Sequence, residues 1–378
     1  MKRLELTAVL LLCYALVFPQ TPPSPAPAWD RTKNCQPVIT RLASPDKYPY
    51  PTTTLGVQIF NAYLSHSLSN LQMEWNVTLN GSVVQKGKAP LLTIGPQRSG
   101  SVRLPVKMPT SPGEVFLNVY YRLKKAQSTL PAGSIVAREQ LRLREYADDL
   151  SIHPAGELSF IDEGGTFTIT SSATTLNLQF NKQTGWLQHY AIGQRLLAED
   201  SLGLVTALDQ NPGSVREPRL QLFSTSTSTD LAVVKADYLI PETPFLLHDR
   251  YTVNAKGEMQ VEQVLEVDTT QPRDTTMRLQ YPPLFGMKWK LPAGPDSVQY
   301  YGTVPVADSC HTSEVRLYKA ASEDTAARTD VRWCKFLDGQ GHGLLIEADS
   351  SLLSISLTGR QLYIGANHYH YIYKVTPQ

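Results

Sequence analysis

Alternation of apolar and polar residues is the dominant pattern of this chain. Over Leu71–Leu79 the odd-numbered residues are apolar and those between them are polar, which is the period of a strand with one buried face. Asn80 and Gly81 follow directly, and this pair favours the two left-handed positions of a type I′ hairpin turn. The alternation recurs over Val102–Met108 and Val115–Leu123. About six or seven short strands in this first block predict an immunoglobulin-like sandwich.

A second β-rich block follows a polar segment, Asp148–Gly156, which we interpret as a linker. Its predicted strands centre on 167–169, 176–180, 247–253, 259–267, 298–301, 331–336, 344–346 and 369–375. A block of about 220 residues is too long for one small sandwich, so we expect a large twisted antiparallel sandwich. Ser224–Thr229 alternates Ser and Thr, which is typical of a solvated edge or loop. The predicted fold class is therefore all-β.

The first residues have the pattern of a secretory signal peptide. Lys2 and Arg3 precede the apolar run Leu6–Phe18, and a Pro-rich polar stretch follows it. The run has 13 residues, whereas a membrane-spanning helix needs about 20. We therefore expect residues 1–28 to be a signal peptide that leaves no transmembrane segment. The mature chain would be exported to the periplasm or to the outside of the cell.

The cysteines leave two questions open. Cys13 would be removed with the signal, and Leu12 before it does not fit a lipid-attachment motif, so we do not expect a lipid anchor. Cys35, Cys310 and Cys334 remain, and an odd number implies at least one free thiol or an intermolecular pair. Cys310 and Cys334 could form a disulfide in an oxidising compartment, or each could be a small buried apolar residue.

Composition and charge exclude several classes of protein. The 35 basic and 34 acidic residues give a net charge of +1, which offers no electrostatic argument for binding nucleic acid or an anionic membrane. Hydrophobic residues make up 42% of the chain and charged residues 18%, which excludes a disordered or fibrous protein. The 378 residues suffice for about two to three domains.

Several segments resemble the C-terminal part of family 2 β-galactosidases, in the family's order. Three resemble the immunoglobulin-like domain that follows the catalytic barrel: Ile59–Tyr63, the Trp75 strand with Asn80-Gly81, and Val136–Leu141. Others resemble the last domain, called the small chain when encoded separately: Leu178–Leu187, Val298–Gly302, Thr329–Trp333, Asp338–Leu345 and Gly365–Tyr371. The resemblance implies a lead-in at 29–56, an immunoglobulin-like domain at 57–147 and a galactose-mutarotase-like supersandwich at 158–378.

The resemblance also implies what this chain lacks. In the family, the two catalytic glutamates and the metal ligands lie in a (β/α)8 barrel, which takes about 250 residues. Only about 35 residues precede the matched region here. We therefore expect no catalytic residue, no metal site and no cofactor. The expected function is that of an accessory chain which binds a galactoside or other glycan, or docks to a separate chain that carries the barrel.

Three family motifs are altered. Thr303–Asp308 replaces a Gly-Pro-x-Glu-Asn-Tyr segment, and Ala207–Asn211 replaces Pro-Thr-Asp-Asn-Asp. Thr358–Ile364 stands where the family has an insertion whose Trp reaches the sugar site of the barrel. The usual contribution of this domain to catalysis is therefore not expected here.

Five residues are candidates for contacts with a sugar. Indole rings can stack on the apolar face of a pyranose, and Trp186 and Trp333 are the candidates. Trp186 follows a turn, which favours an accessible ring, whereas Trp333 lies in an alternating strand, where packing is the commoner role. Asp209, Asn211 and Arg332 are candidates for polar contacts with hydroxyl groups.

Two other interpretations remain. A self-contained mutarotase-like enzyme would need a His and a carboxylate for general acid–base catalysis, and His189, His248 and His342 are single candidates without a motif. A remnant without selected activity is the third interpretation. Adjacent acids fall in predicted turns or linkers, which favours solvated side chains over a catalytic pair: Asp148-Asp149, Asp162-Glu163 and Glu199-Asp200.

Two local patterns are explained by secondary structure rather than by a metal or phosphate site. His368 and His370 would face the same side of a strand, but no third metal ligand stands at a recognisable spacing, so we expect an outer strand face. Gly339–Gly343 lacks the spacing of a phosphate-binding loop and no helix pattern follows it, so we expect a hairpin turn.

Overall fold

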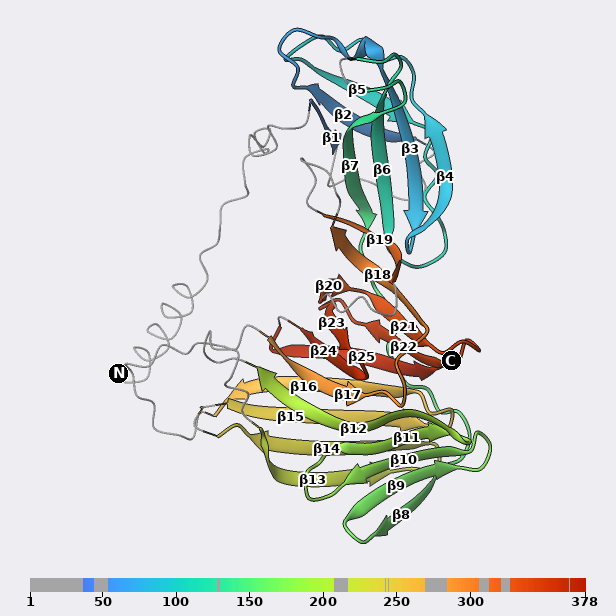
Figure 1. Cartoon of the computed structure of the whole chain (residues 1–378), viewed down its shortest axis with the longest axis vertical. Coiled ribbons are helices and arrows are strands. Elements are labelled where there is room, and N and C mark those ends of the chain that lie inside the picture. The colour runs from blue at the N-terminus through green and yellow to red at the C-terminus, as the bar shows by residue number, and fades with distance from the viewer. Residues whose placement is uncertain are drawn as a thin grey trace, which may run out of the picture.

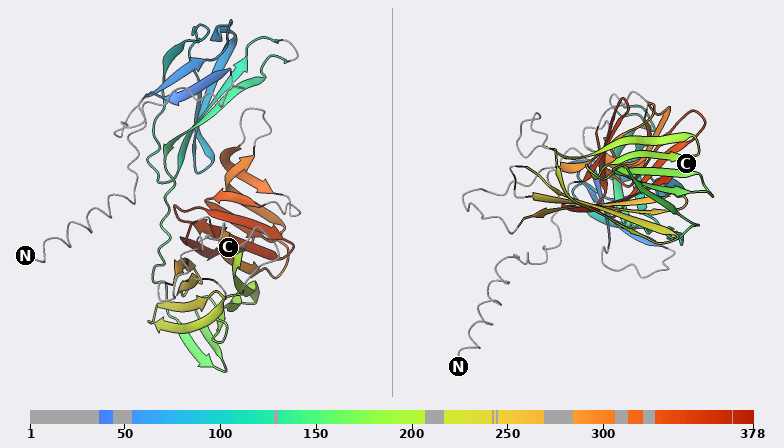
Figure 2. Two further views of the ribbon diagram at one scale, coloured as in Figure 1. Left: turned by 90° about the vertical axis from the view of Figure 1, so that its left-hand side faces the viewer. Right: turned by 90° about the horizontal axis from the view of Figure 1, so that it is seen from below.

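The computed structural model describes residues 37–43, 54–127, 130–206, 217–241, 243, 245–268, 284–305, 313–320, 327–366 and 368–378. The predicted signal peptide 1–28 lies outside these residues. Figure 1 shows two β-rich domains, one above the other, and Figure 2 shows the same arrangement from two other sides.

Domain 1 is a sandwich of two antiparallel sheets. One sheet has the order β1-β2-β5 and the other β4-β3-β6-β7. A short 3-10 helix, η2 (Leu68–Asn70), precedes β3. The strands are β1 (Val38–Leu42), β2 (Leu55–Asn61), β3 (Leu71–Leu79), β4 (Ser82–Lys88), β5 (Ser99–Leu104), β6 (Val115–Leu123) and β7 (Ile135–Arg144). This confirms the predicted sandwich and adds β1, which lies in the segment predicted as a lead-in.

Alternating residues of domain 1 build its core. Met73, Trp75 and Val77 of β3 are buried, and they pack with Val57 of the other sheet and Val119 of β6. Burial of one face of each sheet removes apolar surface from water, which is the main favourable term in folding.

The hairpin turn predicted between β3 and β4 is present. Asn80 has a φ of 47° and Gly81 a φ of 82°, so both lie in the left-handed region that a type I′ turn requires. The turn therefore follows directly from the local sequence.

Domain 2 is a larger sandwich of two nine-stranded antiparallel sheets. Their orders are β20-β23-β24-β17-β12-β11-β10-β9-β8 and β13-β14-β15-β16-β25-β22-β21-β18-β19. The strands of the first half are β8 (Ser159–Glu163), β9 (Thr166–Ser171), β10 (Leu176–Asn181), β11 (Leu187–Ile192), β12 (Arg195–Thr206), β13 (Arg219–Thr227), β14 (Leu231–Leu239), β15 (Phe245–Asn254) and β16 (Met259–Val267). Those of the second half are β17 (Leu284–Lys290), β18 (Ser297–Pro305), β19 (Ser313–Ala320), β20 (Arg328–Val331), β21 (Trp333–Leu337), β22 (Gly343–Ala348), β23 (Leu353–Thr358), β24 (Gln361–Ala366) and β25 (His370–Pro377). The predicted large antiparallel sandwich is confirmed.

Aromatic residues fill the space between the two sheets of domain 2. Phe180 of one sheet meets Tyr251 of the other edge to face, with ring centroids 5.0 Å apart. Phe285 and Tyr371 form a second such pair at 5.3 Å. Pairs of this geometry add to the free energy gained by burial alone. These pairs join the two sheets across one shared hydrophobic core.

The segment between the domains lies against domain 2. The Asn254 Nδ2 donates to the carbonyl of His153 at 2.9 Å, and the Gln260 Nε2 donates to that of Leu150 at 3.1 Å. The Leu150 side chain is buried. Figure 2 shows this segment running down the side of domain 2. The predicted linker therefore packs against domain 2 rather than hanging free, and we call the whole segment between β7 and β8, residues 145–158, the strap.

Other local predictions can be compared with the structure. Ser224–Thr227 belongs to β13, an edge strand, so the expected solvated edge is present. Asp338 Oδ1 accepts the N–H groups of Gln340 and His342, which closes the hairpin turn predicted at Gly339–Gly343. His370 lies on an exposed strand face and its Nε2 is 2.8 Å from Glu262 Oε1.

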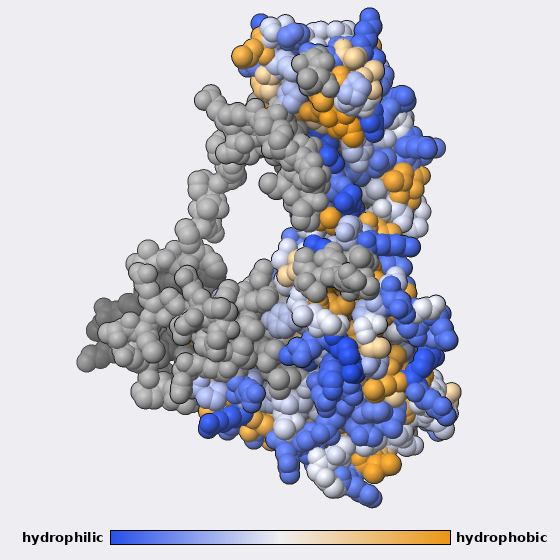
Figure 3. All heavy atoms as spheres, in the orientation of Figure 1, coloured by the Kyte–Doolittle hydropathy of each residue, from blue (hydrophilic) through white to orange (hydrophobic). Residues whose placement is uncertain are grey.

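The surface in view is mostly hydrophilic. Figure 3 shows hydrophilic residues over much of the visible face of both domains, with hydrophobic ones scattered between them. Isolated exposed apolar residues are normal for a folded protein and do not by themselves mark a binding surface. Within the described ranges, no helix has the length and hydrophobicity needed to cross a bilayer.

Candidate functional site

A buried ion pair joins the two domains. Glu114 precedes β6 in domain 1 and is 0% exposed, and Arg332 precedes β21 in domain 2 and is 3% exposed. The Arg332 Nε donates to Glu114 Oε2 at 2.8 Å, and its Nη2 donates to Oε1 at 2.9 Å. This fork-to-fork geometry is the strongest form of an arginine–carboxylate contact.

The remaining groups around this pair come from domain 2. The Tyr301 hydroxyl of β18 donates to Glu114 Oε2 at 2.8 Å. The Arg332 Nη1 donates to the Asp330 carbonyl at 2.6 Å, and its guanidinium carbon lies 5.7 Å from the centre of the Tyr301 ring. Burial, reinforced by the negative charge of Glu114, raises the pKa of Tyr301, so its hydroxyl stays protonated and donates.

The hairpin turn between β3 and β4 fixes Glu114 in place. The Glu114 backbone N–H donates to Asn80 Oδ1 at 2.8 Å, and the Asn80 N–H donates to the Glu114 carbonyl at 2.9 Å. A Cβ atom on Gly81 would lie 3.0 Å from both the Tyr301 ring and the backbone nitrogen of Leu317. The turn therefore packs closely on domain 2, and a side chain at Gly81 would crowd these neighbours.

A second contact extends the backbone pairing of domain 2. The Gln140 Nε2 of β7 donates to the Val315 carbonyl at 2.9 Å, and the Val315 N–H donates to Gln140 Oε1 at 2.8 Å. The side-chain amide thus makes the same two hydrogen bonds to β19 that a neighbouring strand would make. The Arg138 Nη1 lies 3.7 Å from Glu314 Oε2 beside it.

The start of the strap adds a third contact. The Tyr146 hydroxyl lies 3.1 Å from the carbonyl of Arg332 and 3.2 Å from that of Ala348. Burial, with the nearby Asp148 carboxylate, raises the pKa of Tyr146. Together the ion pair, the Gln140 amide and Tyr146 form what we call the junction, which links the two domains.

Two of the predicted sugar-contacting residues have structural roles instead. Arg332 was expected to contact hydroxyl groups, but its guanidinium is buried in the junction and bonded to Glu114 and Asp330. Trp186 was expected to be accessible, but it is 8% exposed and stacks on Tyr238 with ring centroids 4.3 Å apart. These surroundings leave neither side chain free for a sugar.

The other candidates have different positions. Trp333 begins β21, is half-buried, and its ring lies 6.4 Å from that of Tyr301, at the edge of the junction. Asp209 and Asn211 lie outside the described residues, as does Cys310. Cys334 is a buried free thiol whose pKa is raised by burial.

A histidine and carboxylates meet on the outer face of one sheet of domain 2. The His248 Nδ1 of β15 is 2.7 Å from Asp237 Oδ1 of β14, and its Nε2 is 4.0 Å from Glu266 Oε2 of β16. His248 and Asp237 are both about one-third exposed. This arrangement could transfer a proton to or from a bound molecule.

The adjacent acids are mostly paired or solvated. Asp162-Glu163 and Glu199-Asp200 lie in strands rather than in the predicted turns. Glu199 is bonded by Lys290 and Arg360, and these cations lower its pKa. In the part of the chain that the structure describes, no group of three or more His, Cys, Asp or Glu side chains is placed to hold a metal ion.

Little in the sequence marks Glu114 as a functional or structural residue. It stands alone after Pro112 and Gly113 and before the apolar strand β6, so an acid at a strand entrance is the only local signal. Its partner Arg332 lies 218 residues further along the chain. Pairing over such a distance cannot be read from periodicity or turn chemistry.

Two protein families match this sequence. Residues 57–144 match the family described as "Beta-galactosidase, domain 4". Residues 172–371 match the family described as "Beta galactosidase small chain". The two matches correspond to domain 1 and to most of domain 2.

Curated relatives and solved structures were also found. A β-galactosidase of Priestia megaterium is 25% identical over 366 residues, covering 88% of this chain and 33% of that protein. A β-galactosidase of Yersinia pestis bv. Antiqua (strain Angola) is 33% identical over 122 residues, covering 27% of this chain and 12% of that protein. This chain therefore spans at most a third of the length of these relatives.

Among solved structures, galactose 1-epimerase from Lactobacillus acidophilus NCFM has a TM-score of 0.34 and 9% identity, over 59% of this chain and 99% of that one. A glycosyl hydrolase family 38 protein from Enterococcus faecalis has a TM-score of 0.31 and 9% identity, over 88% of this chain and 43% of that one. The small-chain match covers more than half of the 378 residues. The chain therefore belongs to the β-galactosidase small-chain family, with a β-galactosidase domain 4 as its first domain.

Proposed function

We propose that this chain is an accessory part of a β-galactosidase and serves a catalytic barrel rather than hydrolysing galactosides itself. The family matches support the relation to β-galactosidase. The observation that carries the accessory role is the junction, because it keeps both matched domains in one arrangement. A preformed two-domain surface binds a partner with less loss of entropy than two loosely tethered domains would.

A direct assay tests this proposal. The purified chain is expected to give no turnover of a nitrophenyl β-galactoside above buffer. A tagged chain recovered from its native source is expected to carry a stoichiometric partner that has a family 2 barrel, and the complex should hydrolyse the substrate. Turnover by the chain alone, abolished by substituting its own carboxylates, would refute the accessory role.

We also infer that the chain is exported and that it acts in the periplasm or outside the cell. Lys2, Arg3 and the apolar run Leu6–Phe18 support this inference. Cell fractionation with mass spectrometry of the mature N-terminus tests it. Recovery of the chain in the cytoplasm with its N-terminal segment intact would refute it.

A second candidate function is a mutarotase-like activity of domain 2. The contact between His248 Nδ1 and Asp237 Oδ1 at 2.7 Å, with Glu266 nearby, favours it, since general acid–base catalysis needs such a pair at an accessible surface. Polarimetry on freshly dissolved galactose is the test, with His248→Ala as the matched variant. A rate equal to that of buffer removes this candidate.

A further inference from the structure

Three connections of domain 1 meet at the end that lies away from domain 2. They join β2 to β3, β4 to β5 and β6 to β7, and they span residues 62–70, 89–98 and 124–134. Figure 1 shows this end at the top of the molecule, opposite the junction. We call the described residues of these three loops the tip.

Hydrogen bonds tie the three loops of the tip together. The Asn61 Nδ2 donates to the carbonyls of His66 at 2.8 Å and Ile94 at 3.1 Å, which links the first loop to the second. The Lys124 N–H donates to the Asn70 carbonyl at 2.9 Å, which links the third loop to the first. The tip is therefore one preformed surface rather than three independent loops.

Each loop of the tip presents an exposed leucine. Leu64 is 87% exposed, Leu91 is 62% exposed and Leu130 is 47% exposed. One exposed leucine is ordinary on a folded protein. Three at the same end of a sandwich, one from each loop, form an apolar surface that is costly to keep in water. This surface needs a second observation to indicate what covers it, and the charges around it supply one.

Cations without acids accompany these leucines. The three loops contain Arg98, Lys124 and Lys125, which are all exposed, and their sequence has no Asp or Glu. The Lys124 Nζ donates to the carbonyl of Ser69 at 2.8 Å. That acceptor is neutral, so the charge of Lys124 is not cancelled. The tip therefore combines exposed apolar side chains with a positive charge.

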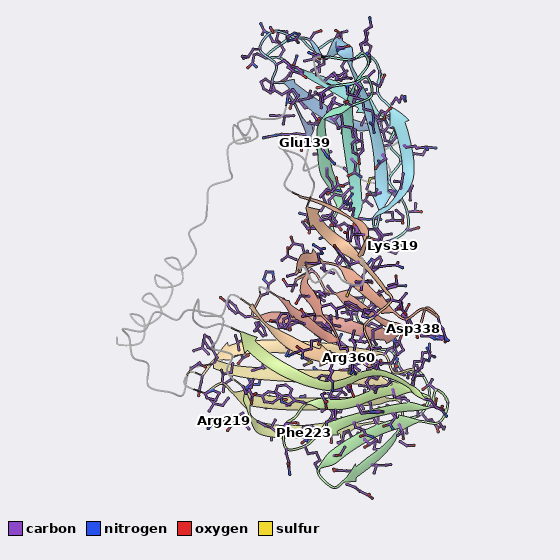
Figure 4. The ribbon with its side chains drawn as sticks, viewed as in Figure 1. Glu139, Arg219, Phe223, Lys319, Asp338 and Arg360 are labelled. Atoms are coloured by element: carbon purple, nitrogen blue, oxygen red, sulfur yellow. The ribbon has the colours of Figure 1, made fainter. Side chains whose placement is uncertain are left out.

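The acids elsewhere in domain 1 do not offset this charge. From β2 to β7 the sequence has eleven Lys and Arg but three Glu. Glu74 is bonded by the Lys88 Nζ at 3.1 Å and by the Arg122 Nε at 2.8 Å, which leaves one positive charge among these three side chains. Glu114 is buried in the junction, and Glu139 is buried in β7, where Figure 4 labels it below the tip.

The small net charge of the whole chain conceals this distribution. From β2 to β7 the sequence carries a net charge of +8, whereas residues 158–378 contain 18 basic and 24 acidic residues. The two charges nearly cancel in the total of +1. Attraction to an anionic surface depends on the charge that faces it, because salt screens charges more than about 10 Å away. A basic tip can therefore bind such a surface although the chain as a whole is almost neutral.

We propose that the tip of domain 1 docks on a lipid bilayer that contains anionic phospholipids. The three leucines enter the boundary between headgroups and acyl chains, and the three loop cations face the lipid phosphates. Burial of apolar surface and attraction to anionic lipids add to each other in this kind of peripheral binding. The acidic domain 2 lies at the opposite end and is kept away from the membrane. This inference goes beyond the accessory role and does not depend on it.

Co-sedimentation of the mature chain with lipid vesicles tests the proposal, since removal of the signal peptide excludes its apolar run as the membrane-binding segment. Vesicles of phosphatidylcholine with phosphatidylglycerol should sediment the chain, and vesicles of phosphatidylcholine alone should sediment much less. Arg98→Glu with Lys125→Glu should lower the partition coefficient at least about tenfold, because each cation near an anionic surface contributes about a fivefold attraction. Leu64→Ser with Leu91→Ser should lower it about tenfold, because less apolar surface is buried.

Arg103→Glu with Lys107→Glu is the matched control. Both residues are exposed, and they lie at or beyond the end of β5 that is far from the tip. This variant has the same net charge as the tip charge variant, so it should keep most of the binding if the tip is the docking surface. Thermal melting of each variant verifies that it folds.

The proposal is overturned if the mature chain does not sediment with the anionic vesicles, or if the tip and control charge variants lose binding equally. Binding of the leucine variant at the native level would also overturn it. Soluble heparin provides a last comparison: capture of the chain by heparin, without sedimentation by vesicles, would assign the tip to an anionic polymer instead of a membrane. Assembly with a barrel-bearing partner is measured separately, so failure of docking and failure of the accessory role give different results.

Discussion

Removing Arg332 should destabilise the whole chain through the junction. In Arg332→Ala, Glu114, which is 0% exposed in the native chain, loses the two donors now at 2.8 and 2.9 Å. The Tyr301 hydroxyl remains, but it carries no charge to balance the carboxylate. Leaving a buried charge without its partner typically costs about 3–5 kcal/mol, and we expect a loss of that size here.

The measurement is urea unfolding followed by tryptophan fluorescence, with hydrogen exchange at the backbone N–H groups of Asn80 and Glu114 as a local probe. Arg142→Ala is the matched control, because Arg142 forms an exposed pair with Glu145 at 3.8 Å, with side chains 51% and 82% exposed. An exposed pair contributes at most about 1 kcal/mol, so this control should unfold nearly as the native chain does.

A double variant separates the charge from the packing. Glu114→Gln combined with Arg332→Met leaves no unpaired charge and keeps an acceptor for Tyr301, so it should recover most of the lost stability. If Arg332→Ala costs less than about 1 kcal/mol, or if the double variant is no more stable than the single one, the buried ion pair does not hold the domains as argued.

Three further predictions concern the core of domain 2. Burial raises the pKa of Asp249 from 3.8 to about 7, so the folded state keeps a proton that the unfolded chain releases. Stability should therefore fall by about 4 kcal/mol as pH rises from about 4 to 7 and then level off; Asp249→Asn should remove this slope in urea midpoints measured across that range. Gly185→Ala should lower the thermal midpoint, because φ is +78° and the new Cβ would lie 2.3 Å from the Tyr238 hydroxyl; an unchanged midpoint would contradict this packing. The Cys334 thiol should resist alkylation in the native state and react only on unfolding, because it is buried and its pKa is raised; rapid labelling of the folded chain would contradict its burial.

Local chemistry made much of the fold predictable. The alternation in β3 and the Asn80-Gly81 turn depend on neighbours in sequence, and both were read correctly. The burial of Trp186 is not predictable in this way, because the turn before it folds back onto Tyr238 of another strand. A residue after a turn is exposed only when no segment from elsewhere in the chain packs on it. The local sequence does not show whether such a segment exists.

The candidate site was less predictable than the fold for the same reason. Arg332 is a polar residue beside the aromatic Trp333, and a residue that contacts a sugar would stand in the same kind of sequence. Its use in the junction depends on Glu114, in the other domain. The role of Gln140 is not predictable from its local sequence. Its side-chain amide forms strand-like hydrogen bonds with β19, and only the structure shows that β19 lies beside it.

The packed strap changes where the second domain can be cut. Asn254 and Gln260 donate to carbonyls of the strap, and Tyr146 at its start reaches two carbonyls of domain 2. A fragment that begins at residue 158 would lose all of these contacts and expose the surface beneath Leu150. Truncations and fusions of domain 2 should therefore keep Tyr146 and be made on the domain 1 side of the strap.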